Sequence, residues 1–137
     1  MALTHLLDTS VLTRLSRDVV RRAAEPLVVA GRAARAGISD LEVGFSARTI
    51  DEWETLAASI NELRLVETTA DHVRRARQTQ RLLAERGLRG RPIPDLLIAA
   101  AAETESLTVL HYDADFDVIA SVTGQQCDWI VPRGSID

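Results

Sequence analysis

The sequence contains no lysine, and this absence excludes several kinds of chemistry. All 16 of its basic residues are arginine. Without lysine there is no P-loop, whose lysine reaches the phosphates of a nucleotide, and no Schiff-base catalysis, which needs a lysine amine. A receiver domain would need a lysine as well. These classes of site are therefore excluded.

Cysteine and long apolar runs are also scarce. Cys127 is the only cysteine, so it has no partner for an internal disulfide or for a thiolate metal site. No apolar run approaches the roughly 20 residues of a membrane span. Residues 1–5 carry no basic cluster ahead of an apolar stretch, so we do not expect a signal peptide. The sequence therefore favours a cytoplasmic protein with no membrane contact.

Several catalytic signatures are missing too. There is no G-x-G-x-x-G after the first apolar run, and G-x-S-x-G is absent. A phosphatase of the haloacid-dehalogenase type would need a second acid two residues after Asp8, where Ser10 stands. The histidines at 5, 72 and 111 have no metal-ligand spacing, and we interpret them as ordinary strand or surface residues.

Length and composition are those of one globular domain with a sizeable core. The 137 residues are 46% hydrophobic and 26% charged, with a net charge of -4. The charge is unevenly spread, because residues 64–91 hold eight arginines and three acids, a local surplus of five positive charges. A solvated helix face is the simplest interpretation of each arginine. As a group, they could also follow a phosphate backbone.

Short apolar runs alternate with helical patterns along the whole chain. Strands are predicted at residues 3–8, 37–39, 64–67, 107–110 and 128–131. Helices are predicted at about 11–25, 27–35, 39–47, 49–60, 68–87 and 94–105, with a short one after 113. This alternation is typical of an α/β fold with a parallel sheet and right-handed crossovers.

Local signals set the boundaries of these helices. Pro26 is expected to break the first helical pattern, since proline disfavours helical geometry in the residue before it. Capping boxes are predicted at 39–42, 49–52 and 68–71. The helix that begins at Pro94 is apolar on all sides, which indicates a helix buried in the middle of the domain.

Several acidic residues lie directly after predicted strands or in the first turns of predicted helices. Asp8 ends the first strand, and Glu42 and Asp95 lie in the first turns of two helices. Asp113 follows the fourth strand, with Asp115 two residues on. The carboxyl ends of strands and the helix starts that follow them share one edge of an α/β sheet. These acids can therefore converge although they are far apart in sequence.

Each acid also has an ordinary interpretation. An acid at a helix N-terminus contributes about 0.3–1 kcal/mol, and this reading suffices for Glu42 taken alone. Asp8 is different, because a carboxylate that ends an apolar central strand is costly unless it is paired. If the acids meet, their repulsion raises their pKa values unless a cation lies among them. Oxygen ligands suit Mg²⁺ or Mn²⁺ rather than zinc. Such ions activate water and stabilise in-line phosphoryl displacement.

Four motifs stand in order along the chain. They are Leu-Leu-Asp-Thr-Ser at 6–10, Ser-Asp-Leu-Glu at 39–42, Ile-Pro-Asp-Leu-Leu-Ile-Ala-Ala at 93–100 and His-Tyr-Asp-Ala-Asp-Phe at 111–116. This set resembles the PIN-domain ribonucleases, and most of all the VapC toxins of bacterial type II toxin–antitoxin modules. The resemblance covers residues 1–137 as a single PIN domain. It implies a three-layer α/β/α fold with a central parallel sheet.

The resemblance also implies an activity and the residues that perform it. The activity is that of a Mg²⁺- or Mn²⁺-dependent endoribonuclease, a hydrolase in which metal-activated water attacks a phosphodiester of an RNA such as tRNA or rRNA. The acids that carry over as catalytic are Asp8, Glu42, Asp95 and Asp113. The same four carry over as metal ligands, with Asp115 as a fifth, and Asp117 leaves open which downstream acid binds directly. Thr9 or Ser10 matches the family hydroxyl that orients a carboxylate or a water.

Partners follow from the same resemblance. The family forms homodimers, and a VapB-type antitoxin blocks its active site. We expect helices between Pro26 and Ile60 to project and to bind a dimer mate or the antitoxin through Val28, Val29, Trp53, Leu56 and Ile60. RNA is expected to be flanked by a set of arginines, namely Arg14, Arg17, Arg74, Arg77 and Arg81.

Two other functions stay open from the sequence. One is a non-catalytic PIN-like module that binds RNA or a protein, and the intact set of acids argues against it. The other is a nuclease or phosphatase that uses the same metal site on DNA.

Overall fold

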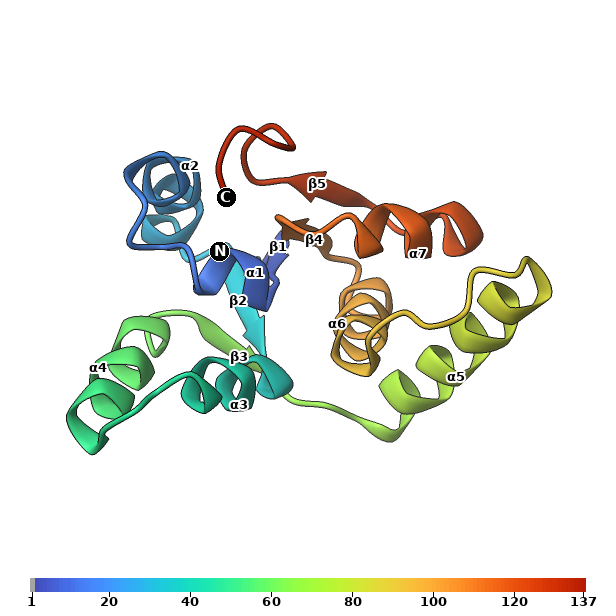
Figure 1. The fold of residues 1–137 in the computed structure, drawn as a ribbon, viewed down its shortest axis with the longest axis horizontal. Coiled ribbons are helices and arrows are strands. Elements are labelled where there is room, and N and C mark those ends of the chain that lie inside the picture. The colour runs from blue at the N-terminus through green and yellow to red at the C-terminus, as the bar shows by residue number, and fades with distance from the viewer. Residues whose placement is uncertain (1) are drawn as a thin grey trace.

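The computed structural model describes residues 2–137, in which five parallel strands form one sheet (Figure 1). The strands are β1 (His5–Leu7), β2 (Ala33–Ala36), β3 (Arg64–Val66), β4 (Thr108–His111) and β5 (Cys127–Trp129). Their order across the sheet is β3-β2-β1-β4-β5. β1 is central, with Leu6 in register with Ala34 on one side and Val109 on the other. The predicted parallel sheet is confirmed, and the acid after β1 lies in the middle of its edge.

Helices cover both faces of this sheet (Figure 1). In residues 2–137 they are α1 (Thr9–Leu12), α2 (Asp18–Val29), α3 (Gly37–Phe45), α4 (Ile50–Ile60), α5 (Ala70–Glu85), α6 (Ile93–Thr104) and α7 (Asp115–Thr123). Leu6 and Val109 belong to a core with α5, α6 and α7, whereas Leu7 and Leu110 belong to a core with α1 to α4. Successive strand residues face opposite sides, so β1 and β4 contribute to both cores. The three-layer α/β/α fold is confirmed.

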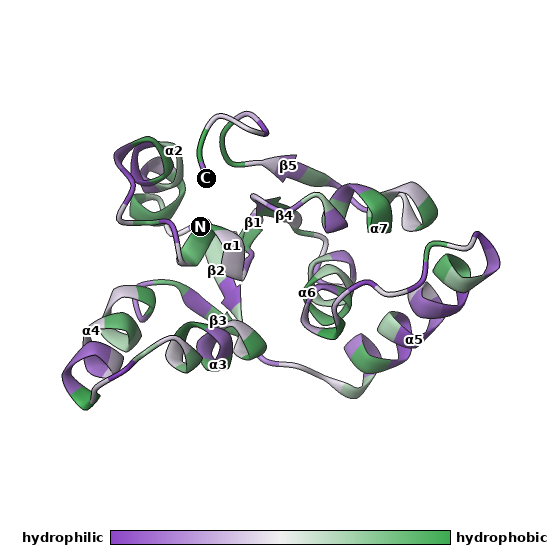
Figure 2. Ribbon diagram, viewed as in Figure 1, coloured by the Kyte–Doolittle hydropathy of each residue, from purple (hydrophilic) through white to green (hydrophobic). Residues whose placement is uncertain are grey.

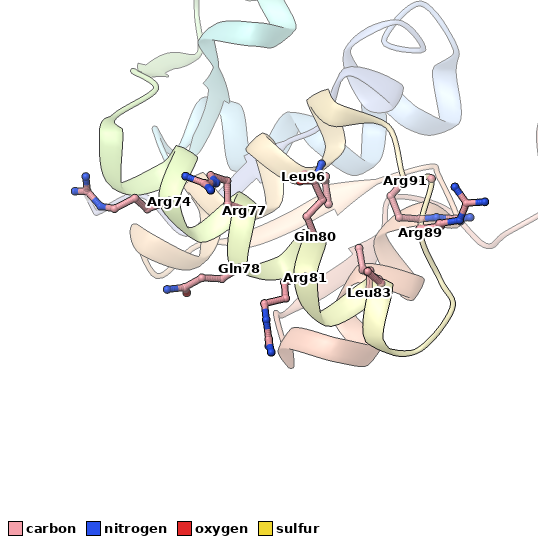
Figure 3. A pocket seen from close by; sticks show the side chains of 11 residues that line it. Arg74, Arg77, Gln78, Gln80, Arg81, Leu83, Arg89, Arg91 and Leu96 are labelled. Carbon is pink, nitrogen blue, oxygen red and sulfur yellow. The ribbon is translucent and has the colours of Figure 1, made fainter.

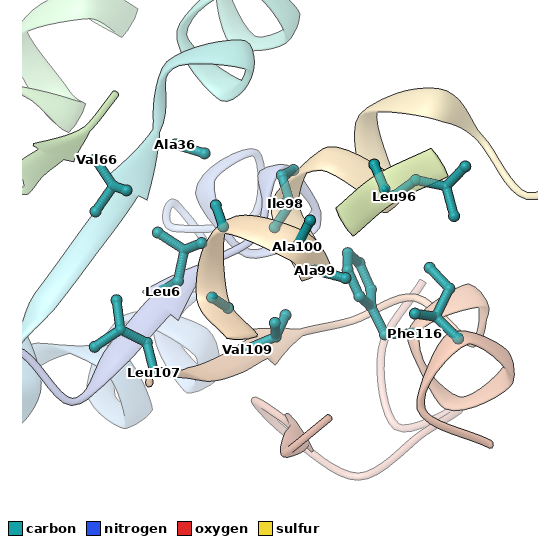
Figure 4. Packing of buried hydrophobic residues seen from close by; sticks show 14 of the residues in the cluster. Leu6, Ala36, Val66, Leu96, Ile98, Ala99, Ala100, Leu107, Val109 and Phe116 are labelled. Carbon is teal, nitrogen blue, oxygen red and sulfur yellow. The ribbon is translucent and has the colours of Figure 1, made fainter. Parts of the chain in front are cut away.

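The helix predicted to be buried is α6. Ile98 is fully buried and its alanines at 99–102 are at most 4% exposed. Figure 4 shows Ile98, Ala99 and Ala100 close to Leu6 and Phe116. The small alanine side chains let the helix lie close against the sheet. This packing fixes the N-terminal turn of α6, which carries Asp95, relative to β1.

Helix α5 is amphipathic. Its buried positions, His72, Ala76, Thr79 and Leu83, recur every three or four residues and form one face. Figure 2 shows α5 with both hydrophobic and hydrophilic turns. Within residues 2–137, no helix combines the length and apolar character needed to cross a bilayer.

The second strand differs from its prediction. It lies at Ala33–Ala36, where a helix was predicted, and α3 already begins at Gly37. Alanine has a high helix propensity, but parallel pairing with β1 outweighs it here. Pro26 does not break α2, which continues to Val29, so the predicted break is wrong. The helix ends before Gly31, whose φ of 69° is a left-handed conformation that suits glycine.

The predicted caps agree only in part. Thr49 caps α4 by accepting from the Glu52 amide at 3.1 Å, which is one half of the predicted capping box. The third cap lies one residue later than predicted, since Thr69 accepts from the amide of His72. His72 is fully buried, so the prediction of a surface residue is wrong. Ser39 is not a cap, because α3 begins two residues before it.

Candidate active site

One edge of the sheet gathers side chains from four segments of the chain. Asp8 follows β1, and Asp113 follows β4. Asp95 lies in the first turn of α6, and Glu42 lies in α3, where it contacts the residue that follows Asp8. The convergence predicted from strand ends and helix starts is thus present for Asp8, Asp95 and Asp113. Glu42 lies beyond the first turn of α3, which begins at Gly37, so its predicted place in a first turn is wrong.

Three of the acids are close enough to share a cation. Asp95, Asp113 and Asp115 each offer a carboxylate oxygen, and these oxygens lie within 4.8 Å of one another. Asp95 is only 7% exposed, and Asp113 and Asp115 are half-buried. Asp8 and Glu42 do not belong to this group among the described residues. Asp8 nevertheless interacts electrostatically with both Asp95 and Asp113.

The site strongly disfavours negative charge when it holds only protein atoms. Burial, together with the charges of Asp8, Asp113 and Asp115, raises the pKa of Asp95 to about 8. Burial also raises the pKa of Asp8 to about 6, against the opposing effect of its hydrogen bonds to Ser10. Asp8 Oδ1 and Asp95 Oδ2 are buried and have no hydrogen-bond partner. Buried oxygens without partners and mutually repelling carboxylates are what a divalent cation would satisfy.

Ser10 holds Asp8 in place. Its hydroxyl donates to Asp8 Oδ2 at 2.6 Å, and its amide donates to the same oxygen at 2.9 Å. The hydroxyl also accepts from the backbone amide of Tyr112 at 2.8 Å. Ser10 therefore joins the segment after β1 to the segment after β4, and it leaves only Asp8 Oδ1 without a protein partner.

Thr9 holds the Glu42 side chain in place through a hydrogen bond. Its hydroxyl lies 2.7 Å from Glu42 Oε1 and 2.8 Å from the hydroxyl of Ser39, and both contacts are hydrogen bonds. Ser39 is fully buried. The sequence reading missed this role of Ser39, because its position before Glu42 also fits a capping box.

The side chains of Asp115 and Asp117 contact different residues. Asp115 Oδ1 accepts from Arg91 Nη1 at 2.6 Å, and the Asp115 amide donates to Asp113 Oδ1 at 2.9 Å. Asp117 instead accepts from the indole of Trp129 at 3.1 Å. Of the two candidates, Asp115 is the one in the acid cluster.

The same architecture occurs in known proteins. The family profile described as PIN domain matches residues 5–122. The chain belongs to the PIN-domain family. It is 64% identical to Ribonuclease VapC51 of Mycobacterium tuberculosis (strain ATCC 25618 / H37Rv) over 137 residues, covering 100% of both chains. It is 41% identical to Ribonuclease VapC21 of the same organism, covering 98% of this chain and 99% of the relative.

Solved structures show the same fold for this PIN-domain protein. The DNA-bound VapBC of Salmonella typhimurium matches with a TM-score of 0.79 and 18% identity, covering 94% of this chain and 99% of the other. VapBC-5 of Mycobacterium tuberculosis matches with a TM-score of 0.67 and 25% identity, covering 96% of this chain and 98% of the other.

The arginines predicted to flank RNA lie in two separate places in the PIN domain. Arg14 donates to the carbonyl of Ser10 at 2.8 Å, and both Arg14 and Arg17 bind Asp137 at the end of the chain. The other three, Arg74, Arg77 and Arg81, line a cavity along α5. Among the described residues, the first pair does not line that cavity.

Arg91 is the site residue that the sequence reading did not select. In the sequence it is one of eight arginines of residues 64–91, and its spacing does not distinguish it from the others. Its ion pair with Asp115 has an N–O distance of 2.6 Å, and both side chains are about three-quarters buried (28% and 26% exposed). The only available signal was its place directly before Pro92, at the start of α6.

Proposed function

We infer that this PIN-domain protein is a VapC-type toxin, an endoribonuclease that hydrolyses RNA phosphodiester bonds in the cytoplasm with Mg²⁺ or Mn²⁺. The observation that carries this inference is the 64% identity, over the full length, to a protein named as a ribonuclease. The cluster of buried acids at the sheet edge agrees with it. The relatives that share the sequence so extensively are ribonucleases by name, which favours RNA over DNA as the substrate.

Asp8, Asp95, Asp113 and Asp115 are the proposed metal ligands. All offer carboxylate oxygens, the donors that Mg²⁺ and Mn²⁺ prefer, and neither histidine nor cysteine joins the group of described acids. When bound, the ion offsets the repulsion among the carboxylates, polarises a phosphoryl oxygen and lowers the pKa of the attacking water. Glu42 is proposed as a further metal ligand or as the general base.

The remaining site residues position these acids. Ser10 orients Asp8, and Arg91 fixes Asp115. Thr9 binds Glu42 Oε1, and within the described residues Glu42 Oε2 has no hydrogen-bond partner. That free oxygen is available to take a proton from the water as it attacks phosphorus. The P–O bond to the leaving nucleotide then breaks. The leaving oxygen takes a proton from solvent water, and Glu42 releases its proton to solvent.

A VapB-type antitoxin is the proposed partner, and the toxin is proposed to form a homodimer. The solved structures with this fold include several VapBC toxin–antitoxin complexes. Side chains on α3 and α4 leave apolar surface for such contacts, with Phe45 91% and Leu41 72% exposed. Of the apolar residues predicted for this surface, Val29 and Trp53 are exposed. Ile60 is buried within its own subunit, so the prediction is wrong for that residue.

A substrate and metal panel tests the proposed function. The purified protein, freed of antitoxin, is incubated with total RNA, with tRNA and rRNA, and with single- and double-stranded DNA. Each substrate is tested with Mg²⁺, with Mn²⁺ and with EDTA. We expect discrete cuts in RNA that require metal. Cleavage of DNA alone, or no cleavage of RNA where a control nuclease cuts it, would contradict the proposal.

A further inference from the structure

A cavity of about 770 Å³ lies along α5. It is formed by α5 from Arg74 to Ala84, by residues 89–91 of the following loop and by Leu96 in the first half of α6. Figure 3 shows the arginines of this cavity extending from two sides, with Arg74, Arg77 and Arg81 on α5 and Arg89 and Arg91 on the loop. Its volume is within the range of about 300–1,000 Å³ that is usual for small-ligand sites.

The cavity adjoins the acid cluster. Arg91 lines it and at the same time donates through Nη1 to Asp115 Oδ1 at 2.6 Å. Leu96, which also lines it, directly follows Asp95. Arg91 Nε is buried and has no hydrogen-bond partner. A ligand in the cavity would therefore lie next to the proposed cleavage site.

The charges of the cavity wall call for an anionic ligand. Five guanidinium groups line the cavity, and no carboxylate does among the described residues. Three of the five, Arg74, Arg81 and Arg91, form ion pairs with acids that lie outside the lining. Arg77 and Arg89 have no hydrogen bond or ion pair in the described part of the chain. The whole protein has a net charge of -4, so this concentration of positive charge is local. Unpaired arginines are suited to phosphate, because their planar N–H groups match its oxygens.

The cavity wall also contains apolar and amide groups, which a phosphate alone would not require. Leu83 and Leu96, which are 1% and 3% exposed, form an apolar part of the lining. Gln78 and Gln80 add amide groups that both donate and accept hydrogen bonds. Single-stranded RNA is recognised through bases that leave the stack, lie on guanidinium or apolar surfaces and bind polar side chains at their edges.

We propose that this cavity is a nucleotide-binding subsite, which takes one unstacked nucleotide of the RNA strand beside the phosphodiester that is cut. The subsite rests on the ribonuclease function inferred above. Arg77 and Arg89 bind its phosphate, and the leucines and glutamines contact its base. A base in a duplex cannot enter without unpairing, so the subsite selects loops and other single-stranded RNA.

A matched pair of double variants tests the subsite. R77Q/R89Q removes the two unpaired guanidinium groups of the cavity. R22Q/R48Q removes two exposed arginines that do not line it, on α2 and ahead of α4, and it lowers the net charge by the same amount. A fluorescent oligoribonucleotide of defined sequence, single-stranded or annealed to its complement, is titrated in EDTA, where no strand is cut. Melting temperatures show that each variant is folded.

The expected result is specific to the cavity. R77Q/R89Q weakens binding of the single strand roughly tenfold and lowers the slope of log K against log salt by about 1.4, whereas R22Q/R48Q behaves like the wild type. The wild type binds the single strand more tightly than the duplex. An abasic residue at one particular position weakens binding to the wild type but not to R77Q/R89Q.

Three outcomes would overturn the subsite. The first is equal binding by the two double variants, and the second is equal binding of single strand and duplex by the wild type. The third is that R77Q/R89Q keeps its affinity for RNA but no longer copurifies with the antitoxin, which would make the cavity a protein-binding site. This binding experiment is independent of the cleavage experiment that tests the proposed function, because binding is measured in EDTA, where no RNA is cut. A wild type that cuts RNA while both double variants bind it equally refutes the subsite alone.

Discussion

Ser10 illustrates how single side chains set the chemistry of the sheet edge. It donates twice to Asp8 Oδ2 and accepts from the Tyr112 amide, so one hydroxyl connects two neighbouring strand ends. Its hydrogen bonds lower the pKa of Asp8, which burial raises. The Ser10 side chain thus keeps Asp8 closer to the ionised form that a cation needs.

Replacing Ser10 with alanine should harm both stability and activity. The Tyr112 amide loses its partner, and an unsatisfied buried donor costs about 1–3 kcal/mol. The pKa of Asp8 should rise, since a hydrogen bond to its charged form is lost. Urea unfolding measures the first effect, and the pH dependence of RNA cleavage measures the second. An unchanged pH profile would contradict this role of Ser10.

The pKa of Asp95 predicts how the metal-free protein responds to pH. Folding raises this pKa from about 3.9 in an unfolded chain to about 8. The folded state therefore binds the proton more tightly, and its stability falls as pH rises between these two values. Asp8, with a pKa of about 6, acts in the same direction over a narrower range.

Melting temperatures in EDTA should accordingly be lower at pH 8 than at pH 5, by at least about 3 °C. Asp95→Asn removes the titrating group and should flatten this dependence. Mn²⁺ should stabilise the wild type more at pH 8 than at pH 6, because protons compete with the metal for the carboxylates. A pH dependence of the melting temperature that is the same in the wild type and in Asp95→Asn would contradict the raised pKa of Asp95.

The residues of the site differ in how far the sequence could predict them. Asp8, Asp95 and Asp113 were predictable, because acids at strand ends and helix starts must share one edge. The separation of Asp115 from Asp117 was not, because it depends on how the first turn of α7 is oriented. The ion pair of Arg91 with Asp115 depends on the path of a loop, for which the sequence holds no periodic signal.

At the scale of elements, α6 positions the site. Its uniformly apolar sequence predicted its burial, and its alanines lie against the sheet in the core that contains Leu6 and Val109. The second strand was predicted at residues 37–39 instead of Ala33–Ala36. The segment Ala33–Ala36 has the composition of a helix and becomes a strand through pairing with β1 and β3. Tertiary pairing, which the sequence does not display, outweighs local propensity there.

Overpacking of α6 should therefore be costly. Ala100→Leu adds volume to a side chain that is 2% exposed, and we expect a loss of about 1–3 kcal/mol in the free energy of unfolding. Ala58→Leu, at an exposed position of α4, makes the same chemical change and serves as the control. Denaturant unfolding of both variants measures the difference. Equal stability of the two would show that α6 is not tightly packed against the sheet.

At the scale of the whole molecule, one edge of the sheet carries a cluster of acids beside a cavity lined by arginines. The acid cluster lies at the end of β1 and β4, and the arginine-lined cavity adjoins it through Arg91. The acids suit a cation and the arginines suit the phosphates of an RNA strand. The ion pair of Arg91 with Asp115 lies between the two and belongs to both.

The central claim is that Asp8 anchors a metal site that cuts RNA. The most direct test is the single-turnover rate of RNA cleavage in Mn²⁺ for the wild type, Asp8→Asn and Asp117→Asn. Asp117 is the matched control, because it bonds to Trp129 outside the acid cluster. We predict that Asp8→Asn lowers the rate on the order of 100-fold or more without unfolding the protein, and that Asp117→Asn stays close to the wild type. A folded Asp8→Asn variant that cleaves RNA as fast as the wild type would contradict the account.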